Sequence, residues 1–177
     1  MEELIIKTIE TEEPDRIIDE AMQQYGQEIL QLVFSYVKDR TVAEDLTQEI
    51  FIKCYKSLHT YKRTAKFRTW LWRIAINHCK DYLKSWYNRN VRATEDELIK
   101  TWSQDGTIEQ ELIRKDEDQQ LASAVMALPV NYREVIYLFY FEELPIKEIA
   151  VMIEAKENTV KTRLRRAKEL LKEKLEG

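Results

Sequence analysis

Residues 145–175 read PIKEIAVMIEAKENTVKTRLRRAKELLKEKL, and this stretch decides the fold of the C-terminal part of the chain. Apolar residues recur in it at three- and four-residue steps, which predicts two amphipathic helices with a break near Glu154. Their packed positions are Ile146, Ile149, Ala150 and Ile153, and then Val160, Leu164, Ala167 and Leu171. Because Ala150 is small, the helices can cross closely at a steep angle, as a helix-turn-helix requires.

The second of these helices is cationic between its packed positions. The cations are Lys161, Arg163, Arg165, Arg166 and Lys168. In the major groove, Arg can bind guanine through two hydrogen bonds while Lys contacts phosphate, so a cationic helix held away from its own core is typical of DNA recognition. The alternative is a solvated C-terminal helix whose basic residues only complement its dipole. The place of the charge, on the second helix of this pattern, favours DNA.

Another cationic zone lies between Lys53 and Arg92. It holds eleven Lys and Arg against the single acid Asp81, a charge of +10 in a chain whose net charge is -4. Its aromatic residues are Tyr55, Tyr61, Phe67, Trp70, Trp72, Tyr82, Trp86 and Tyr87. Unpaired bases stack on rings while Lys and Arg follow the phosphates, so this zone is typical of single-strand binding. For any one of these rings, packing in the core is the more ordinary role.

The rest of the pattern predicts an all-α protein. Residues 15–38 carry apolar residues at helical steps after Pro14, and residues 41–58 form a helix that opens on a capping box of Thr41 and Glu44. A third helix carries inward Leu71, Ile74, Ala75, His78, Tyr82 and Trp86.

The periodicity then fades over residues 88–107, which we interpret as a linker. Apolar residues that could dock this linker are Leu98, Ile99 and Trp102. Helical periodicity returns at Ile108 and ends at Pro129, and residues 132–140 form the next helix.

Composition and spacing argue against several classes of protein. No apolar run approaches the roughly 20 residues that span a bilayer, and the acidic start is unlike a signal peptide, so we expect a cytoplasmic protein without membrane insertion. The two cysteines, Cys54 and Cys79, are too few for a disulfide scaffold. Together with His59 and His78 they could supply four zinc ligands, but their spacing is poor for one ion. We therefore predict no metal and no cofactor. The sequence contains no nucleophile–base constellation and no Gly-rich phosphate loop, so we predict no enzyme activity.

Several motifs together resemble bacterial extracytoplasmic-function (ECF) sigma factors of RNA polymerase. In the C-terminal part they are Leu128-Pro129, REVI at 133–136, EIA at 148–150 and TVKTRLRRA at 159–167. In the N-terminal part, AEDLTQEIF at 43–51 resembles the family's polymerase-binding helix, and FRTWLWRIAIN at 67–77 resembles its promoter-melting helix. The match follows the family's order from about Asp15 to the C-terminus.

The resemblance implies two small helical domains joined by a flexible linker. Sigma region 2 would cover residues 1–87, the linker 88–107, and sigma region 4 residues 108–177. Region 2 would bind core RNA polymerase and open the -10 element of promoter DNA, and region 4 would bind the duplex -35 element. An anti-sigma factor is a further expected partner. Two domains that each bind DNA with modest affinity bind more tightly together when polymerase holds them at the spacing of the two promoter elements, because of their effective concentration. The isolated chain should therefore bind promoter duplex weakly.

The motifs also imply a role for individual residues. Those expected to bind core polymerase are Asp45, Gln48 and Glu49. Those expected to bind the -10 element are Tyr61, Lys62, Arg63, Lys66, Phe67, Arg68, Trp70, Arg73 and Asn77. Those expected to bind the -35 element are Asn158, Thr159, Lys161, Thr162, Arg163, Arg165 and Arg166.

The chain departs from the family's pattern at the turn of the helix-turn-helix. Glu154-Ala155 stands where a Gly is frequent, and a left-handed conformation at a residue with a side chain costs on the order of 1 kcal/mol. Asn158 is expected to cap the second helix. A rival interpretation is a helix-turn-helix repressor or activator that binds a palindromic operator as a dimer and needs no polymerase.

Overall fold

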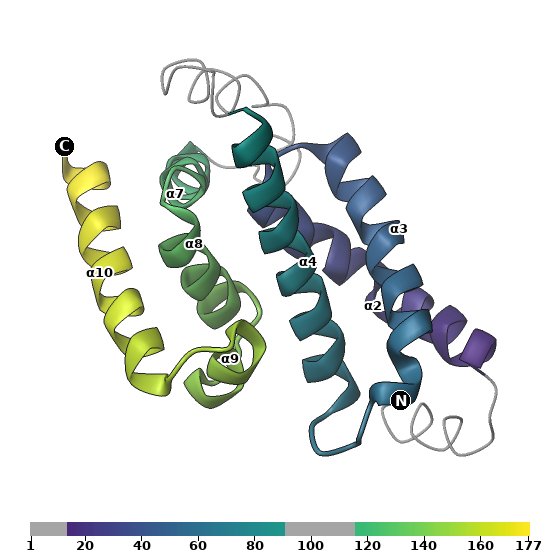
Figure 1. Ribbon diagram of the computed structural model, residues 1–177. Coiled ribbons are helices and arrows are strands. Elements are labelled where there is room, and N and C mark those ends of the chain that lie inside the picture. Colours follow the sequence, from purple (N-terminus) through teal and green to yellow (C-terminus); the bar gives the residue numbers. More distant parts are fainter. Residues whose placement is uncertain (1–13, 91–115) are drawn as a thin grey trace.

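A computed structural model of the protein describes residues 14–90 and 116–177 (Figure 1). Its elements in these two ranges are all helical, as predicted, and they form two bundles. The N-terminal bundle consists of α2 (Pro14–Val37), α3 (Arg40–Ser57), the short 3-10 turn η1 (Leu58–Thr60) and α4 (Phe67–Arg89). The C-terminal bundle consists of α7 (Asp116–Met126), α8 (Val130–Ile136), the π-helical turn η2 (Tyr137–Phe141), α9 (Ile146–Ile153) and α10 (Glu157–Glu176).

The N-terminal bundle packs α2 against both α3 and α4. Its core contains Trp72 and Phe67, which are fully buried, and Tyr25 contacts both rings at centroid distances of 5.5 and 6.5 Å. The predicted apolar stripe of α2 is displaced at one position, because Met22 is 45% exposed while Ala21 is buried. Of the neighbouring tryptophans Trp70 and Trp72, it is Trp72 that belongs to the core, because it is fully buried whereas Trp70 is half-buried.

The N-terminus of α3 differs from the predicted capping box. Asp39 is the N-cap, and its side chain accepts a hydrogen bond from the backbone N–H of Val42 at 3.0 Å. Glu44 instead lies 3.2 Å from Arg40 in an exposed pair one turn apart. The helix thus begins one residue earlier than predicted, and the carboxylate of Asp39 satisfies an N–H that would otherwise have no partner within the helix.

This cap makes a first prediction about stability. We expect Asp39→Ala to lower the free energy of unfolding by about 1 kcal/mol, because it removes the acceptor for the Val42 N–H. Asp39→Asn keeps an oxygen acceptor and should retain most of the stability. Thr41→Ala is the matched control and should have almost no effect. Urea unfolding followed by circular dichroism measures all three; a larger loss for Thr41→Ala than for Asp39→Ala would restore the predicted capping box.

The C-terminal bundle contains the predicted helix-turn-helix. Ile149, Ile153, Val160 and Leu164 are all buried between α9 and α10 and their neighbours. Glu154 ends α9 in the left-handed region, with φ 56° and ψ 45°, at the position where a strained turn was predicted. The cap prediction for Asn158 is wrong, because Lys156 is the N-cap of α10, without a side-chain hydrogen bond, and Asn158 lies in its first turn.

The two bundles are in direct contact. α4 packs against α9, and α2 packs against α8. Arg133 of α8 is buried and donates hydrogen bonds to the carbonyl oxygens of Leu128 at 3.1 Å and of Tyr36 at 3.0 Å. One guanidinium thus joins the loop before α8 to the end of α2. In Figure 1, α4 lies on the side of the N-terminal bundle that faces α8 and α9.

The predicted linker lies almost entirely outside the described residues. Asn88 and Arg89 still belong to α4, so this helix extends past the predicted end of the first domain at residue 87. The possible docking residues Leu98, Ile99 and Trp102 and the predicted helix start at Ile108 also lie outside the described residues. In the described ranges, no helix is both long and apolar enough to cross a membrane.

Candidate nucleic-acid interface

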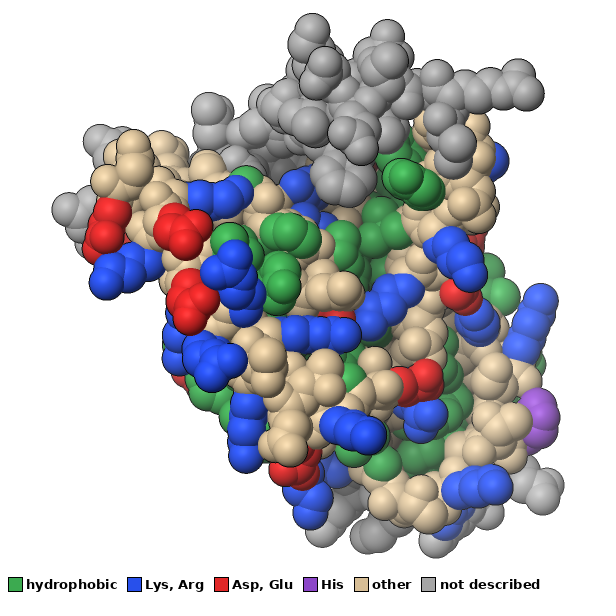
Figure 2. All heavy atoms as spheres, turned by 60° about the vertical axis from the view of Figure 1, so that its left-hand side comes forward, with side chains coloured by type: hydrophobic (Ala, Val, Ile, Leu, Met, Phe, Trp, Pro, Cys, Tyr) green, Lys and Arg blue, Asp and Glu red, His purple; other side chains and the backbone are tan. Residues whose placement is uncertain are grey.

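The outer face of α10 carries the cations of the predicted recognition helix. The buried inner face of α10 is formed by Val160, Leu164 and Ala167. Their spacing turns Thr162 and Arg165, both exposed, away from the bundle. Lys161, Arg166 and Asn158 are exposed beside them. Figure 2 turns this side of the molecule forward and shows Lys and Arg side chains spread over the face, with Asp and Glu side chains beside some of them.

Two of the predicted recognition residues are turned toward the protein. Thr159 is half-buried, and Arg163 is half-buried with its guanidinium 3.9 Å from the carboxylate of Glu134. Arg166 is exposed but shares its charge with Glu169 at 3.1 Å, one turn further on. Arg165 therefore combines outward direction and charge without a carboxylate partner among the described residues.

The predicted aromatic site at the start of α4 is a packed cluster. Tyr61 is 8% exposed and Phe67 is fully buried, so neither ring offers a free face. The ring centroid of Trp70 lies 5.3 Å from that of Tyr61 and 5.5 Å from that of Phe67. Trp70 itself is half-buried. The structure thus gives Tyr61 and Phe67 a supporting position behind Trp70.

The loop before α4 is held by its own hydrogen bonds. The hydroxyl of Tyr61 donates to the carbonyl oxygen of Ala65 at 2.6 Å, which closes the loop over four residues. Arg63 lies in the left-handed region with φ 60°. Lys62, Arg63 and Lys66 are exposed on this loop. The predicted cations of the loop therefore surround the edge of the aromatic cluster.

The cations on α4 itself face the C-terminal bundle. Arg73 and Asn77 both donate hydrogen bonds to Glu154, at 2.8 and 3.3 Å. Lys66, just before the helix, lies 3.5 Å from Glu148. In these contacts, predicted DNA-binding residues pair with carboxylates more than 70 positions away in the chain. The local spacing of residues in the sequence could not reveal such pairs.

Arg68 and Trp72 hold a third carboxylate. Trp72 Nε1 donates to Glu142 at 2.7 Å, and the Arg68 guanidinium lies 3.2 Å from the same oxygen. Arg68 also lies over the Trp72 ring, 4.6 Å from its centroid. Burial raises the pKa of Glu142 to about 7, although Arg68 and the Trp72 hydrogen bond act in the opposite direction. Sequence analysis missed Glu142, because its position relative to α4 depends on tertiary contacts.

The predicted polymerase-binding residues lie on the solvent side of α3. Asp45 and Gln48 are exposed opposite the buried stripe of Leu46, Ile50 and Cys54. Glu49 is exposed too, but its carboxylate lies 2.8 Å from His78 Nε2 of α4. The structure also places Ile52, 55% exposed, one turn after Gln48 on the same side. An isolated apolar residue outside the packed stripe was the available signal, and sequence analysis did not use it.

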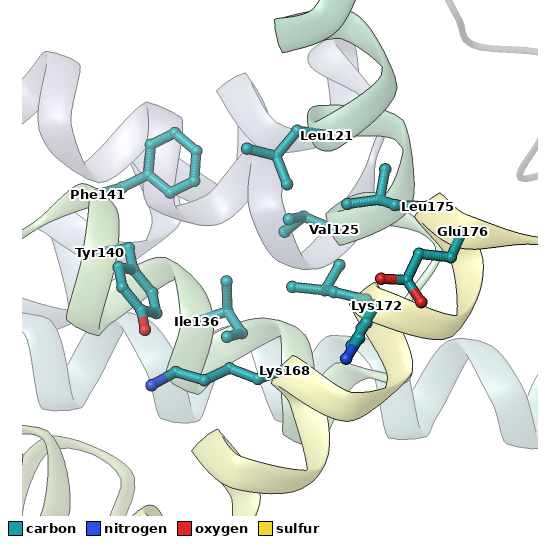
Figure 3. A pocket seen from close by; sticks show the side chains of 10 residues that line it. Leu121, Val125, Ile136, Tyr140, Phe141, Lys168, Lys172, Leu175 and Glu176 are labelled. Carbon is teal, nitrogen blue, oxygen red and sulfur yellow. The ribbon is translucent and has the colours of Figure 1, made fainter.

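A further surface feature is an apolar groove in the C-terminal bundle. Side chains from α7, η2 and α10 converge on it, and it encloses about 540 Å³ (Figure 3). Its apolar lining includes Leu121, Val125, Ile136, Tyr140, Phe141 and Leu175. Phe141 is 62% exposed, so the groove is open to solvent at this end. Lys168 and Lys172 border it from α10.

The cysteine and histidine side chains considered as zinc ligands do not come together in the structure. Cys54 and Cys79 are both fully buried, and burial raises the pKa of the Cys54 thiol to about 12. His78 contacts Glu49 instead. Within residues 14–90 and 116–177, no group of three or more His, Cys, Asp or Glu side chains is arranged to hold a metal ion.

Comparison with known families assigns both bundles. The model of Sigma-70 region 2 matches residues 21–88, and that of Sigma-70 region 4 matches residues 118–171. The ECF RNA polymerase sigma factor SigM of Bacillus subtilis (strain 168) is 33% identical over 156 residues, 88% of this chain and 93% of SigM. The chain belongs to the ECF sigma factors. SigW of the same organism is 31% identical over 177 residues, 96% of this chain and 94% of SigW.

Two solved structures share the fold of this sigma factor. CnrH, in a complex with the cytosolic domain of CnrY, superposes with a TM-score of 0.69 at 21% identity, covering 98% of this chain and 96% of that chain. The sigma factor RpoE of Bartonella quintana, in a complex with the anti-sigma factor NepR, superposes with a TM-score of 0.70 at 18% identity, covering 89% and 96%. The family assignment favours a sigma factor over the rival dimeric regulator, because both region models match in chain order.

Proposed function

We propose that this sigma factor binds core RNA polymerase and directs it to promoters through two separate DNA contacts. Region 4 would read the -35 element as duplex, and region 2 would hold the opened -10 element. The chain itself would perform no bond chemistry. The observation that carries the proposal is the outward cationic face of α10 on a helix-turn-helix, joined in one chain to a region 2 with a separate cationic and aromatic zone.

For the -35 element, the support comes from the geometry of α10. Its buried residues fix the helix in the bundle, so the outward side chains at and around Arg165 can enter a major groove without rearrangement of the core. Arg165 would contact a base edge, and Lys161 and Arg166 would contact the phosphates on either side. Arg163 and Thr159 would contribute less, since both are partly turned toward the protein.

The proposed contact predicts the behaviour of a single variant. Arg165→Ala should reduce promoter-specific transcription by about tenfold, in line with roughly 1–3 kcal/mol for one specific Arg–base contact. Its retention on core polymerase should not change. Lys172→Ala, which removes one cation from the same helix two turns further on, is the control and should remain close to wild type.

Transcription in vitro measures this effect, with purified core polymerase on a genomic template library. Start sites read from the products show whether initiation becomes selective when the sigma factor is added. Random initiation with the wild-type chain would refute the proposed function. Equal transcript levels with Arg165→Ala and wild type would instead remove Arg165 from the recognition face.

For the -10 element, we propose that Trp70 supplies a partly exposed ring. Opening a duplex costs stacking and pairing energy, and a protein without a fuel must offset that cost by binding the separated strand. Stacking of a base on an aromatic ring contributes roughly 1–3 kcal/mol. Tyr61 and Phe67 would fix the orientation of Trp70 from behind, while Lys62, Arg63 and Lys66 would bind phosphates.

For core polymerase, we propose the outer side of α3 as the contact surface. Asp45 and Gln48 offer a carboxylate and an amide to a basic, polar partner, and Ile52 adds an apolar centre of the kind that protein interfaces bury. The contact of Glu49 with His78 would orient that carboxylate at the border of the surface.

A double variant tests this surface. We expect Asp45→Ala with Gln48→Ala to weaken binding to core polymerase by about tenfold, because central interface residues commonly contribute 1 kcal/mol or more each. Asp19→Ala with Gln23→Ala, an equivalent exposed pair on α2, is the control. Competition for core polymerase against a fluorescently labelled wild-type chain gives both affinities. Full competition by the α3 double variant would show that polymerase binds elsewhere.

An anti-sigma factor is the third partner that we propose. The solved structures of CnrH with CnrY and of RpoE with NepR show relatives of the same fold with protein partners bound. In this chain, the apolar groove bordered by Lys168 and Lys172 is an exposed surface that a protein partner could cover.

A further inference from the structure

The face of α4 that carries Arg68, Arg73 and Asn77 lies against the C-terminal bundle. α4 packs against α9, and α2 packs against α8, so the two bundles share an extended boundary. Figure 1 shows α4 at this boundary. The outer face of α10 and the outer side of α3 carry exposed side chains and lie away from it. The boundary face of α4 is therefore in contact with the C-terminal bundle, whereas the outer face of α10 and the outer side of α3 stay open to solvent.

At the centre of the boundary lies a buried carboxylate. Glu134 of α8 is 2% exposed and accepts a hydrogen bond from the Tyr36 hydroxyl of α2 at 2.6 Å. Lys80 of α4 lies 3.1 Å from its other oxygen. Burial raises the pKa of the Tyr36 hydroxyl, and the charge of Glu134 raises it further, so this hydroxyl stays protonated and donates. With Arg163 of α10 3.9 Å away, four helices from both bundles meet at this one group.

Around this centre, carboxylates of the C-terminal bundle lie where nucleic-acid phosphates would bind. Glu154 holds Arg73 and Asn77, and Glu142 holds Arg68. Glu148 lies opposite Lys66. The ion pairs of Glu154 and Glu148 are substantially exposed and individually weak. They therefore occupy cations of the N-terminal bundle but add little to the stability of the contact between the bundles.

We propose that the free sigma factor is closed on itself, with the acidic side chains of its C-terminal bundle bound to the cationic face of α4 in place of promoter DNA. The buried Glu134–Tyr36 contact holds this closed form, and the outer pairs occupy the cations. Core polymerase or single-stranded DNA must separate the bundles before α4 can act. The consequence for DNA rests on the proposed -10 role of α4; the closed form itself does not.

Cys79 provides an internal probe of opening. It is fully buried on α4, next in the chain to Lys80, whose ammonium lies 3.1 Å from Glu134, and the charge of Glu134 adds to burial in raising the pKa of its thiol. Cys54 is buried in α3, which packs against α2 and α4, so it reports on unfolding of the N-terminal bundle. Alkylation by iodoacetamide, followed by mass spectrometry of the full chain and its peptides, gives both rates.

Two variants should open the boundary by different physical means. Tyr36→Phe removes the hydroxyl that satisfies Glu134, and we expect Cys79 alkylation to accelerate about fivefold or more. Glu154→Lys places a cation against Arg73 and should accelerate it about threefold. Tyr87→Phe and Glu173→Lys make the same chemical changes at exposed positions away from the boundary, and their Cys79 rates should match wild type. The Cys54 rate should stay constant throughout.

The same variants separate closure from DNA binding. Affinity for a fluorescein-labelled 20-nucleotide oligo(dT) should rise several-fold in Tyr36→Phe and not in Tyr87→Phe, since neither changes the net charge. Unchanged Cys79 rates in both boundary variants would overturn the closed form. Faster Cys79 alkylation without a gain in oligo(dT) affinity would support the closed form and refute the proposed -10 role of α4.

Glu142 adds a pH dependence that can be tested on its own. Arg68 and Trp72 of α4, Glu28 of α2 and Tyr137 of η2 face this carboxyl. Its pKa is about 7 in the closed form, and we expect it to return toward the ordinary value when the bundles separate. The closed form therefore binds a proton that the open form releases, so closure gains stability as the pH falls through 7 and loses that contribution above it.

Alkylation of Cys79 at two pH values measures this effect. The rate relative to N-acetylcysteine at the same pH should be roughly tenfold lower at pH 6 than at pH 8. Glu142→Gln should abolish the difference, which also separates Glu142 from His78 as its source. Equal relative rates for the wild-type chain at both pH values would overturn the place of Glu142 in the closed boundary.

Discussion

The arrangement of the two bundles depends on one buried acid and its basic neighbour in the chain. Glu134 meets Tyr36 and Lys80 of the other bundle, while Arg133 binds carbonyl oxygens of both. Burial lowers the pKa of Arg133 to about 10. Buried charges add little net stability compared with apolar packing, but removal of one partner is costly. Such a junction specifies one orientation of the two bundles, whose buried apolar residues belong to one continuous cluster.

The charge distribution of the chain explains how a protein of net charge -4 can serve a polyanion. Among the described residues, cations outnumber acids on α4, on the loop before it and on α10, whereas acids outnumber cations on α2, and further acids lie on the outer side of α3 and along the boundary between the bundles. The acids on α3 suit a protein partner, and those at the boundary suit the chain's own cations. Local charge, and not the total, therefore determines which surface meets DNA.

Helical periodicity was sufficient to predict the all-α fold and the helix-turn-helix, and the resemblance to the family predicted the left-handed turn at Glu154. These features depend on residues within a few turns of one another. The cap of α3 was misplaced because Asp39 and Thr41 are both good cap residues and only the backbone geometry distinguishes them. The supporting place of Tyr61 and Phe67, and the contacts of Arg68 and Arg73, depend on residues distant in the chain, which periodicity does not report.

The left-handed residue at the end of α9 couples two requirements that a glycine would separate. Glycine at position 154 would relax the backbone, but it would carry no carboxylate to reach Arg73 and Asn77. Glu154 thus combines local backbone strain in the helix-turn-helix with a contact that ties this turn to α4. Relatives with glycine at this turn would then be expected to depend more on a separate inhibitor protein to stay inactive, and relatives with an acid there would depend on it less.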